Sequence, residues 1–246
     1  MDAQQLFKAG KLSEAIPALN SQLRDNPSDV RSRTFLFELL CFAGDYERAE
    51  KQLTVLQEEN VKDSMLGALL YHAALAAERT RQQMFETKSF PKQLVNGVAP
   101  GSVKGKLNGK EFQSLTDADP RIGEKLEVFA AGDYLWISYS DIASIQIEPP
   151  KKLRDLLWAP AKIVAGPALQ SRELGEVLLP VISPLSFQHA DDDVRLGRAT
   201  EWCQDENGDE APYGLKNLVV DGEEIPFLEI RHLEVYPASQ SAPASA

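Results

Sequence analysis

Apolar residues recur at helical spacing in the first third of the chain and alternate with polar residues in the rest. Leu66, Leu69, Leu70 and Ala73, for example, fall on one stripe, as on the buried face of a helix. After residue 105, short runs alternate between apolar and polar positions, as strands with one buried face do. The pattern predicts an α+β protein in which a helical N-terminal module precedes a β-rich module.

The helical part contains an internal repeat. The segments LFKAGKLSEAIPAL and LCFAGDYERAEKQL align at an offset of 34 residues, which is the tetratricopeptide period. Each unit of such a repeat is a pair of antiparallel helices, A and B. Gly10 and Gly44 are expected to adopt the left-handed conformation that ends helix A. Ser13 and Asp45 are then expected to cap helix B.

A third helix is predicted over residues 64–85, with Asp63 as its cap. No clear second helix follows it, so this element is expected to close the stack. Two repeats are too few for an independent solenoid. We therefore expect the β-rich module to pack against them.

Tetratricopeptide arrays generally bind peptides along the face formed by their A helices. Repeat position predicts six residues on that face, although each of them taken alone is more typical of an ordinary helix surface. They are Gln4, Phe7, Arg31, Thr34, Glu38 and His72.

Turn signals divide the β-rich module. Asn108-Gly109, Gly132-Asp133 and Asp221-Gly222 are expected to join neighbouring strands. The segment KKLRDLLWAPAKIVA resembles a short helix, and VRLGRATEW resembles a strand with Leu196 and Trp202 on one buried face. Short strands at this spacing favour a small barrel or curled sheet with short helices.

These patterns predict four segments along the chain. They are a tetratricopeptide-like helical domain at 1–90, a linker at 91–105, a β-rich domain at 106–237 and a disordered tail at 238–246.

The net charge of −11 lies mostly in the second module. Residues 1–90 hold 11 basic and 13 acidic side chains, whereas residues 91–246 hold 15 and 24. An acidic chain repels phosphate groups, so nucleic acid is not expected as a partner. Two cysteines, no secretory signal and no membrane-spanning apolar run predict a cytoplasmic protein without membrane contact.

Known catalytic motifs are absent from the sequence, and the three histidines are far apart. The run Asp191-Asp192-Asp193, with His189 before it, is the one candidate for a metal-dependent protein or enzyme. Neighbouring strand residues point to opposite faces, so a solvated turn is the favoured interpretation. Arg195 and Arg198 are expected to tie loops together. We therefore predict a non-enzymatic protein without metal or cofactor.

Two C-terminal segments resemble the ImpE family, whose members are also called SciE-type or TagJ proteins. The segments are LLPVISPLSFQHADDDVRLGRATEW and KKLRDLLWAPAKI, and the repeats and PFLEIRHLEV are similar as well. The resemblance covers nearly the whole chain.

The resemblance implies an accessory protein of the bacterial type VI secretion system. Such a protein is expected to bind a helix of the small contractile-sheath subunit and to link the sheath to its recycling AAA+ ATPase. Two alternatives stay open: a metal-dependent protein using Asp191–Asp193, and a general tetratricopeptide co-chaperone. The co-chaperone would need a basic cluster for a peptide carboxylate, to which only Lys8 and Arg31 contribute on the expected face.

Overall fold

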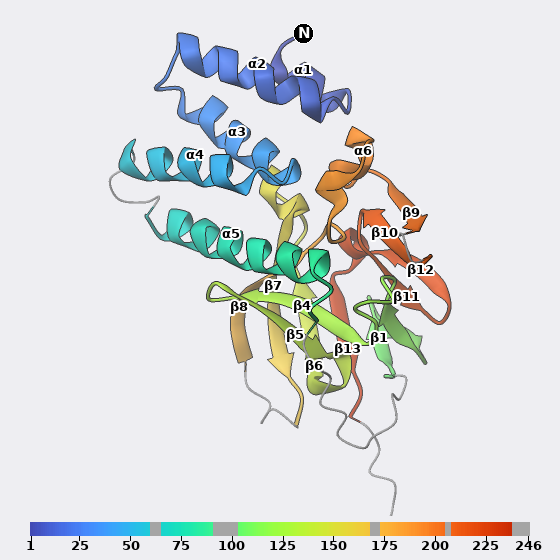
Figure 1. Ribbon diagram of the computed structural model, residues 1–246. Coiled ribbons are helices and arrows are strands. Elements are labelled where there is room, and N and C mark those ends of the chain that lie inside the picture. Colours follow the sequence, from blue (N-terminus) through green and yellow to red (C-terminus); the bar gives the residue numbers. More distant parts are fainter. Residues whose placement is uncertain (60–64, 91–102, 168–172, 205–207, 238–246) are drawn as a thin grey trace, which may run out of the picture.

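The computed structural model describes residues 1–59, 65–90, 103–167, 173–204 and 208–237 (Figure 1). It confirms the α+β class, with helical repeats followed by a β-rich region. Three predictions lie outside the described residues: Asp63 as a cap, most of the linker at 91–105 and the disordered tail at 238–246.

Two antiparallel helix pairs form the repeats, and a fifth, longer helix follows them. Gly10 and Gly44 have φ values of +77° and +73°, which confirms the left-handed ends of the A helices. Asp45 caps the second B helix, because its carboxylate accepts a hydrogen bond from the Arg48 amide at 3.3 Å. The helices are α1 (Ala3–Lys8), α2 (Leu12–Asp25), α3 (Val30–Phe42), α4 (Tyr46–Glu59) and α5 (Met65–Glu86).

The repeat stops because α5 does not turn where the earlier A helices do. The residue 34 positions after Gly44 is Glu78, which lies inside α5. A glutamate favours the helix where a glycine would end it. The C-terminal half of α5 therefore runs on and packs against strands β4 and β5 of the large sheet (Figure 1).

The β-rich region contains open sheets rather than a closed barrel. The large sheet has eight strands in the order β2-β1-β13-β6-β7-β8-β4-β5, and two smaller sheets are β12-β11-β3 and β10-β9. The strands are β1 (Gly105–Leu107), β2 (Lys110–Phe112), β3 (Leu115–Asp117), β4 (Lys125–Ala130), β5 (Asp133–Ser138), β6 (Ile142–Ile147), β7 (Trp158–Ala165), β8 (Glu173–Pro180), β9 (Thr200–Gln204), β10 (Glu210–Gly214), β11 (Asn217–Val220), β12 (Glu223–Pro226) and β13 (His232–Val235).

Short helical elements separate some of these strands. They are η1 (Tyr139–Asp141), η2 (Leu153–Leu156), η4 (Ser186–Gln188), α6 (Asp192–Arg195) and η5 (Phe227–Glu229).

Two of the three predicted hairpin turns form as expected. Asn108-Gly109 joins β1 to β2 with φ values of +49° and +85°, and Asp221-Gly222 joins β11 to β12 with +52° and +87°. Both pairs suit turns that need positive φ at two successive residues. The third turn lies one residue earlier than predicted, at Ala131-Gly132, because β5 already begins at Asp133.

The prediction of a helix over KKLRDLLWAPAKIVA is largely wrong. Only η2 is helical, and from Trp158 onward the segment is strand β7. This strand pairs with β6 on one side and with β8 on the other. Pairing along both edges outweighs the local helical pattern.

The prediction of one strand over VRLGRATEW is also wrong. The aspartates open helix α6, Gly197 has a φ of +65°, and the strand begins only at Thr200. Leu196 is 4% exposed whereas Trp202 is 44% exposed. The two side chains therefore do not share a buried face, because the backbone between them is not extended.

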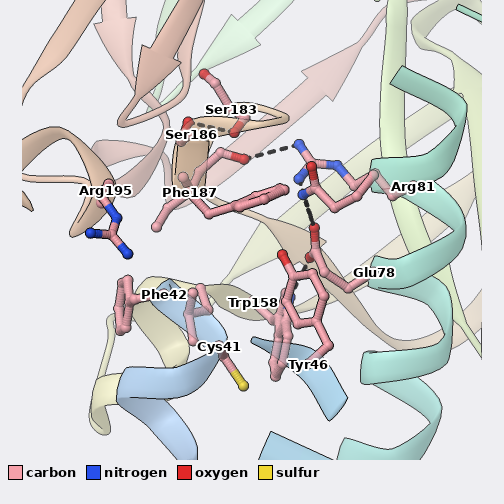
Figure 2. A pocket seen from close by; sticks show the side chains of 13 residues that line it. Cys41, Phe42, Tyr46, Glu78, Arg81, Trp158, Ser183, Ser186, Phe187 and Arg195 are labelled. Carbon is pink, nitrogen blue, oxygen red and sulfur yellow. Dashed lines mark hydrogen bonds and ion pairs between the residues drawn. The ribbon is translucent and has the colours of Figure 1, made fainter. Parts of the chain in front are cut away.

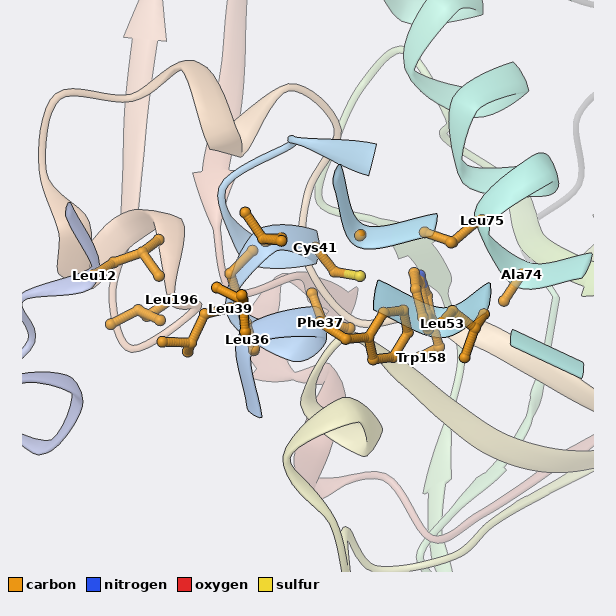
Figure 3. Close-up of a cluster of buried hydrophobic side chains, with 14 of the residues drawn as sticks. Leu12, Leu36, Phe37, Leu39, Cys41, Leu53, Ala74, Leu75, Trp158 and Leu196 are labelled. Atoms are coloured by element: carbon orange, nitrogen blue, oxygen red, sulfur yellow. The ribbon is translucent and has the colours of Figure 1, made fainter. Parts of the chain in front are cut away.

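A large hydrophobic cluster joins the helices to the sheet (Figure 3). It contains Phe37 of α3 and Leu75 of α5 together with Trp158 of β7 and Leu196 after α6. All seven residues from Leu36 to Phe42 of α3 are buried, so the C-terminal half of this helix is covered on every side. A second cluster fills the space between the large sheet and the three-stranded sheet.

Candidate functional site

The predicted peptide-binding face lies only partly open. Gln4 and Arg31 are exposed, and Thr34 is half-buried, its hydroxyl donating to the Val30 carbonyl at 2.8 Å. Phe7 packs edge-on against Phe35, with ring centroids 5.5 Å apart. These residues leave the first two A helices accessible at one side only.

Glu38 lies at the junction between α3 and the C-terminal module. Its side chain is buried, and burial raises its pKa to about 7, although the nearby Arg154 opposes this rise. The Arg154 guanidinium lies 4.4 Å above the ring centroid of Tyr71, and both residues act electrostatically on one another and on Glu38. Tyr71 and Arg154 are not predicted from the sequence, because they meet Glu38 only through the tertiary fold.

His72 is directed toward α4 instead. Its Nδ1 lies 3.6 Å from Glu50 Oε1, and Arg79 bonds the other oxygen of Glu50 at 2.5 Å. Tyr71, the preceding residue, points to the Glu38 junction. The 34-residue period places His72 on the binding face, but in α5 the preceding residue, Tyr71, occupies that position.

The raised pKa of Glu38 makes stability depend on pH. The folded protein keeps a proton on Glu38 up to about pH 7, whereas an unfolded glutamate loses it near pH 4.3. Stability is therefore lost as the pH rises between these values. We expect Glu38→Gln to raise the free energy of unfolding by about 1–3 kcal/mol at pH 8 and by almost nothing at pH 4.5.

Urea unfolding at the two pH values measures this difference. Glu47→Gln, an exposed change on α4, is the matched control and should show no such pH dependence. An equal effect of Glu38→Gln at both pH values would contradict the assignment.

The aspartate run attaches the C-terminal module to the first repeat. The Asp192 carboxylate accepts hydrogen bonds from the Ser13 amide at 2.8 Å and from the Ser13 hydroxyl at 3.0 Å. Ser13 itself does not cap α2, contrary to the prediction, and Lys11 at the N-cap position makes no side-chain cap either. Asp192 thus caps α2 from a distant part of the chain, and such a cap contributes about 1 kcal/mol.

Arg195 and Arg198 complete this attachment, and they bind helices α1 and α2 where the sequence predicted that they tie loops together. Arg195 bonds Asp192 at 2.8 Å and the Ser13 hydroxyl at 3.0 Å. Arg198 donates to the Phe7 carbonyl at 2.6 Å, and its guanidinium lies 4.9 Å from the Phe7 ring centroid. We call Asp192, Arg195 and Arg198 the clamp.

Both repeat glycines contact the C-terminal module. A Cβ atom at Gly10 would overlap the Asp193 carboxylate, and one at Gly44 would overlap the Phe187 ring. Each glycine therefore serves two purposes, since it ends an A helix and also leaves room for the module.

The three aspartates do not converge on one point. Asp191 accepts the Asp193 amide at 2.8 Å, Asp192 binds Ser13 and Arg195, and Asp193 pairs with Arg198 at 3.4 Å. His189 faces Glu201 at 3.3 Å. Within the described residues, no three His, Cys, Asp or Glu side chains are grouped to hold a metal ion.

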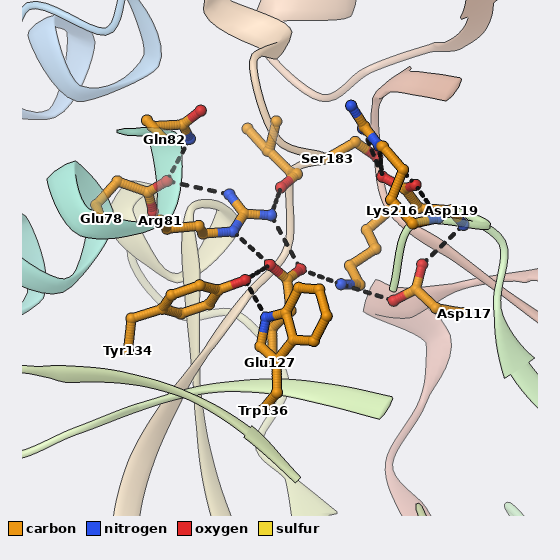
Figure 4. Close-up of polar contacts among 12 residues, drawn as sticks. Glu78, Arg81, Gln82, Asp117, Asp119, Glu127, Tyr134, Trp136, Ser183 and Lys216 are labelled. Carbon is orange, nitrogen blue, oxygen red and sulfur yellow. Dashed lines mark hydrogen bonds and ion pairs between the residues drawn. The ribbon is translucent and has the colours of Figure 1, made fainter. Parts of the chain in front are cut away.

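A buried charge network lies between α5 and the sheets (Figure 4). Arg81 bonds both oxygens of Glu127, at 2.7 and 3.0 Å, and also Glu78 at 3.0 Å. Lys216 contacts Glu127 and pairs with Asp117 at 2.7 Å. Tyr134 donates to Glu127 at 2.6 Å. The network therefore connects α5 to β3, β4 and the segment before β11.

Pairing determines the charge states in this network. Burial alone would raise the pKa of Glu127, but Arg81 and Lys216 outweigh it and hold the pKa well below its usual range. Burial would likewise lower the pKa of Lys216, yet Asp117 and Glu127 raise it. Asp117 has one strong cationic partner, and burial raises its pKa to about 6. The sequence carries little sign of this network, because its members are far apart along the chain.

A small pocket adjoins the network where the two modules meet (Figure 2). Its volume of about 30 Å³ corresponds to one or two water molecules. Both carboxylate oxygens of Glu78 in the pocket wall already accept hydrogen bonds, one from Arg81 and the other from Trp158 Nε1 at 2.7 Å. Burial raises the pKa of the Cys41 thiol well above its usual range, so that thiol stays protonated. The pocket suits bound water rather than a metabolite.

The fold and these contacts define a class: a tetratricopeptide-repeat protein whose helices share a core with a β-rich C-terminal module. The tetratricopeptide model matches residues 6–76, and the model described as ImpE protein matches residues 109–234. The chain belongs to the ImpE family.

Relatives support the assignment over the whole chain. The chain is 32% identical to the type VI secretion system accessory component TagJ of Pseudomonas aeruginosa, over 96% of this chain and 92% of that protein. The crystal structure of protein VPA1032 from Vibrio parahaemolyticus has the same fold, with a TM-score of 0.79 at 22% identity. That alignment covers 96% of this chain and 98% of the other. No helix in the described part of the chain is both long and apolar enough to cross a bilayer.

Proposed function

We propose that this protein is a cytoplasmic, non-enzymatic adaptor of the type VI secretion system. It binds a helix of the small contractile-sheath subunit and links the sheath to the AAA+ ATPase that recycles it. The observation that carries the proposal is the 32% identity to a type VI secretion accessory component over 96% of the chain.

The repeats support a protein-binding role, because A-helix faces commonly accept peptides and helices. Of the six predicted residues, Gln4 and Arg31 are exposed, Glu38 is buried, and the other three, Phe7, Thr34 and His72, are half-buried. Phe7 lies beneath Arg198 of the clamp. Tyr71 and Arg154 are half-buried beside the accessible part. We propose that the partner helix lies along Arg31, Thr34 and Tyr71.

Thr34→Arg tests this surface. An arginine there would project into the path of the partner helix, so we expect the affinity for the purified small sheath subunit to fall at least about tenfold. Isothermal titration calorimetry on the full-length chain measures the change.

Thr54→Arg is the matched control. Thr54 is exposed on α4 and, like Thr34, donates its hydroxyl to the carbonyl four residues earlier, at 3.0 Å. Its replacement should leave the affinity unchanged. Loss of binding in both variants would contradict the proposed surface, and absence of binding by the unmodified protein would contradict the proposed partner. Titration with an acidic C-terminal peptide tests the co-chaperone alternative separately.

A further inference from the structure

Strands β9 and β10 form a two-stranded ribbon that projects beside the large sheet (Figure 1). The base of the ribbon is anchored. The Gly214 amide donates a hydrogen bond to Ser186 Oγ at 2.7 Å, and the Gly214 carbonyl accepts one from the Ser183 amide at 2.8 Å. Within the described residues, β9 pairs with β10 alone. One backbone edge of β9 therefore has no strand beside it.

The pairing register determines which backbone groups lie on that open edge. Opposite residues in an antiparallel pair alternate between hydrogen-bonded and non-hydrogen-bonded sites. Both polar backbone groups of Gly214 are directed away from β9, so the Gly214–Thr200 pair is of the second kind. The pair two residues along, Pro212–Trp202, is then of the same kind.

Proline fits this site because it has no amide hydrogen to donate to a neighbouring strand. Because of this register, the backbone amide and carbonyl groups of Thr200, Trp202 and Gln204 point outward from the ribbon. They form a row of donors and acceptors at the spacing of a β-ladder. Such an open row can template pairing with another chain.

The side chains on this edge indicate what would pair with it. Trp202 is 44% exposed, which is unusual for so large an apolar surface. Glu201, Asp209 and Glu210 are exposed nearby, and residues 200–214 contain no lysine or arginine. The Glu201 carboxylate lies 3.3 Å from His189 Nε2, and the Glu210 carboxylate accepts a hydrogen bond from the Gln204 amide.

We propose that β9 is a docking edge for an extended, basic segment of another protein, which adds a strand to the ribbon. The backbone row supplies the hydrogen bonds, Trp202 supplies an apolar and cation-binding surface, and the carboxylates select positive charge. A second copy of this chain is disfavoured, because the charged side chains of the ribbon are all acidic and two such edges would repel each other. The inference does not depend on the proposed sheath partner.

An eight-residue peptide of alternating lysine and valine, with blocked ends, serves as the probe. We expect hydrogen exchange of the Trp202 and Gln204 amides to slow at least about tenfold when the peptide binds the full-length protein. The amides of Glu201 and Cys203 face β10, so they provide an internal control. Their exchange should change little.

Affinity measurements with variants complete the test. Trp202→Ala is expected to weaken the peptide about tenfold. Tyr236→Ala, which removes another exposed aromatic outside the ribbon, should have no effect. A peptide of alternating glutamate and valine should not bind. Any of three results would overturn the proposal: no binding at millimolar peptide, binding without protection of the Trp202 amide, or equal effects of the two aromatic substitutions.

Discussion

Replacing Arg81 by methionine is expected to lower the free energy of unfolding by about 3–5 kcal/mol. The Arg81 side chain is 2% exposed and bonds Glu127, Glu78 and the Ile182 carbonyl. Methionine keeps much of the volume but leaves two buried carboxylates short of a cation. Removing one partner of a buried ion pair costs more than the pair itself contributes, because the remaining charge is still desolvated.

Urea unfolding followed by circular dichroism measures this loss. Arg81→Lys keeps the charge but not the two parallel bonds to Glu127, so its loss should be intermediate. Lys151→Met removes an exposed cation that pairs with Glu148 at 3.3 Å, and it should cost less than about 1 kcal/mol. If Arg81→Met and Lys151→Met cost the same, the network does not stabilise the fold.

Replacing Trp158 by alanine is expected to cost about 3–5 kcal/mol. Trp158 is 2% exposed, lies in the cluster shared by the helices and the sheet, and stacks on Tyr71 with centroids 6.4 Å apart. The substitution opens a cavity at the junction. It also removes the indole N–H that donates a hydrogen bond to Glu78 at 2.7 Å. Both effects weaken the attachment of α3 and α5 to β7.

Two further tryptophan variants separate these contributions. Trp158→Phe retains most of the packing and loses the donor, so it should cost about 1–3 kcal/mol. Trp202→Ala, at the exposed tryptophan, should change the free energy of unfolding by less than about 0.5 kcal/mol. A small effect of Trp158→Ala would mean that the helices and the sheet do not depend on their shared core.

The shared core and the clamp together change the view of the repeats. A free tetratricopeptide array would offer its whole A-helix face to a partner, but here the C-terminal module covers much of that face. Phe7 lies beneath Arg198, and Trp158 and Leu196 join the helical core. A partner that binds the A helices therefore meets a surface built from both modules.

Local chemistry explains where prediction from the sequence succeeded. Gly10, Gly44, Asn108-Gly109 and Asp221-Gly222 adopt positive φ because glycine, asparagine and aspartate tolerate that conformation at little cost. Asp45 caps its helix by accepting a hydrogen bond from the backbone amide of Arg48. Each of these features depends on residues within a few positions of one another.

Prediction failed where distant segments compete with local preference. The segment at 158–165 is a strand because β6 and β8 pair with it, and the aspartate run begins a helix that docks on Ser13. The junction of Glu38, Tyr71 and Arg154 also joins three separate elements. No spacing along the chain indicates such a meeting.

The sequence by itself determined the repeat, its period, most turns and the order of a helical and a β-rich module. These features follow from hydrophobic periodicity and from the conformations that single residues allow. The tertiary structure alone decided that Asp192, Arg195 and Arg198 form a clamp and that the buried charges pair. It also decided the pairing register of β9 and β10, which leaves the Trp202 backbone on an open edge. Those outcomes depend on which groups meet across the folded chain, and for the paired charges burial makes the meeting energetically large.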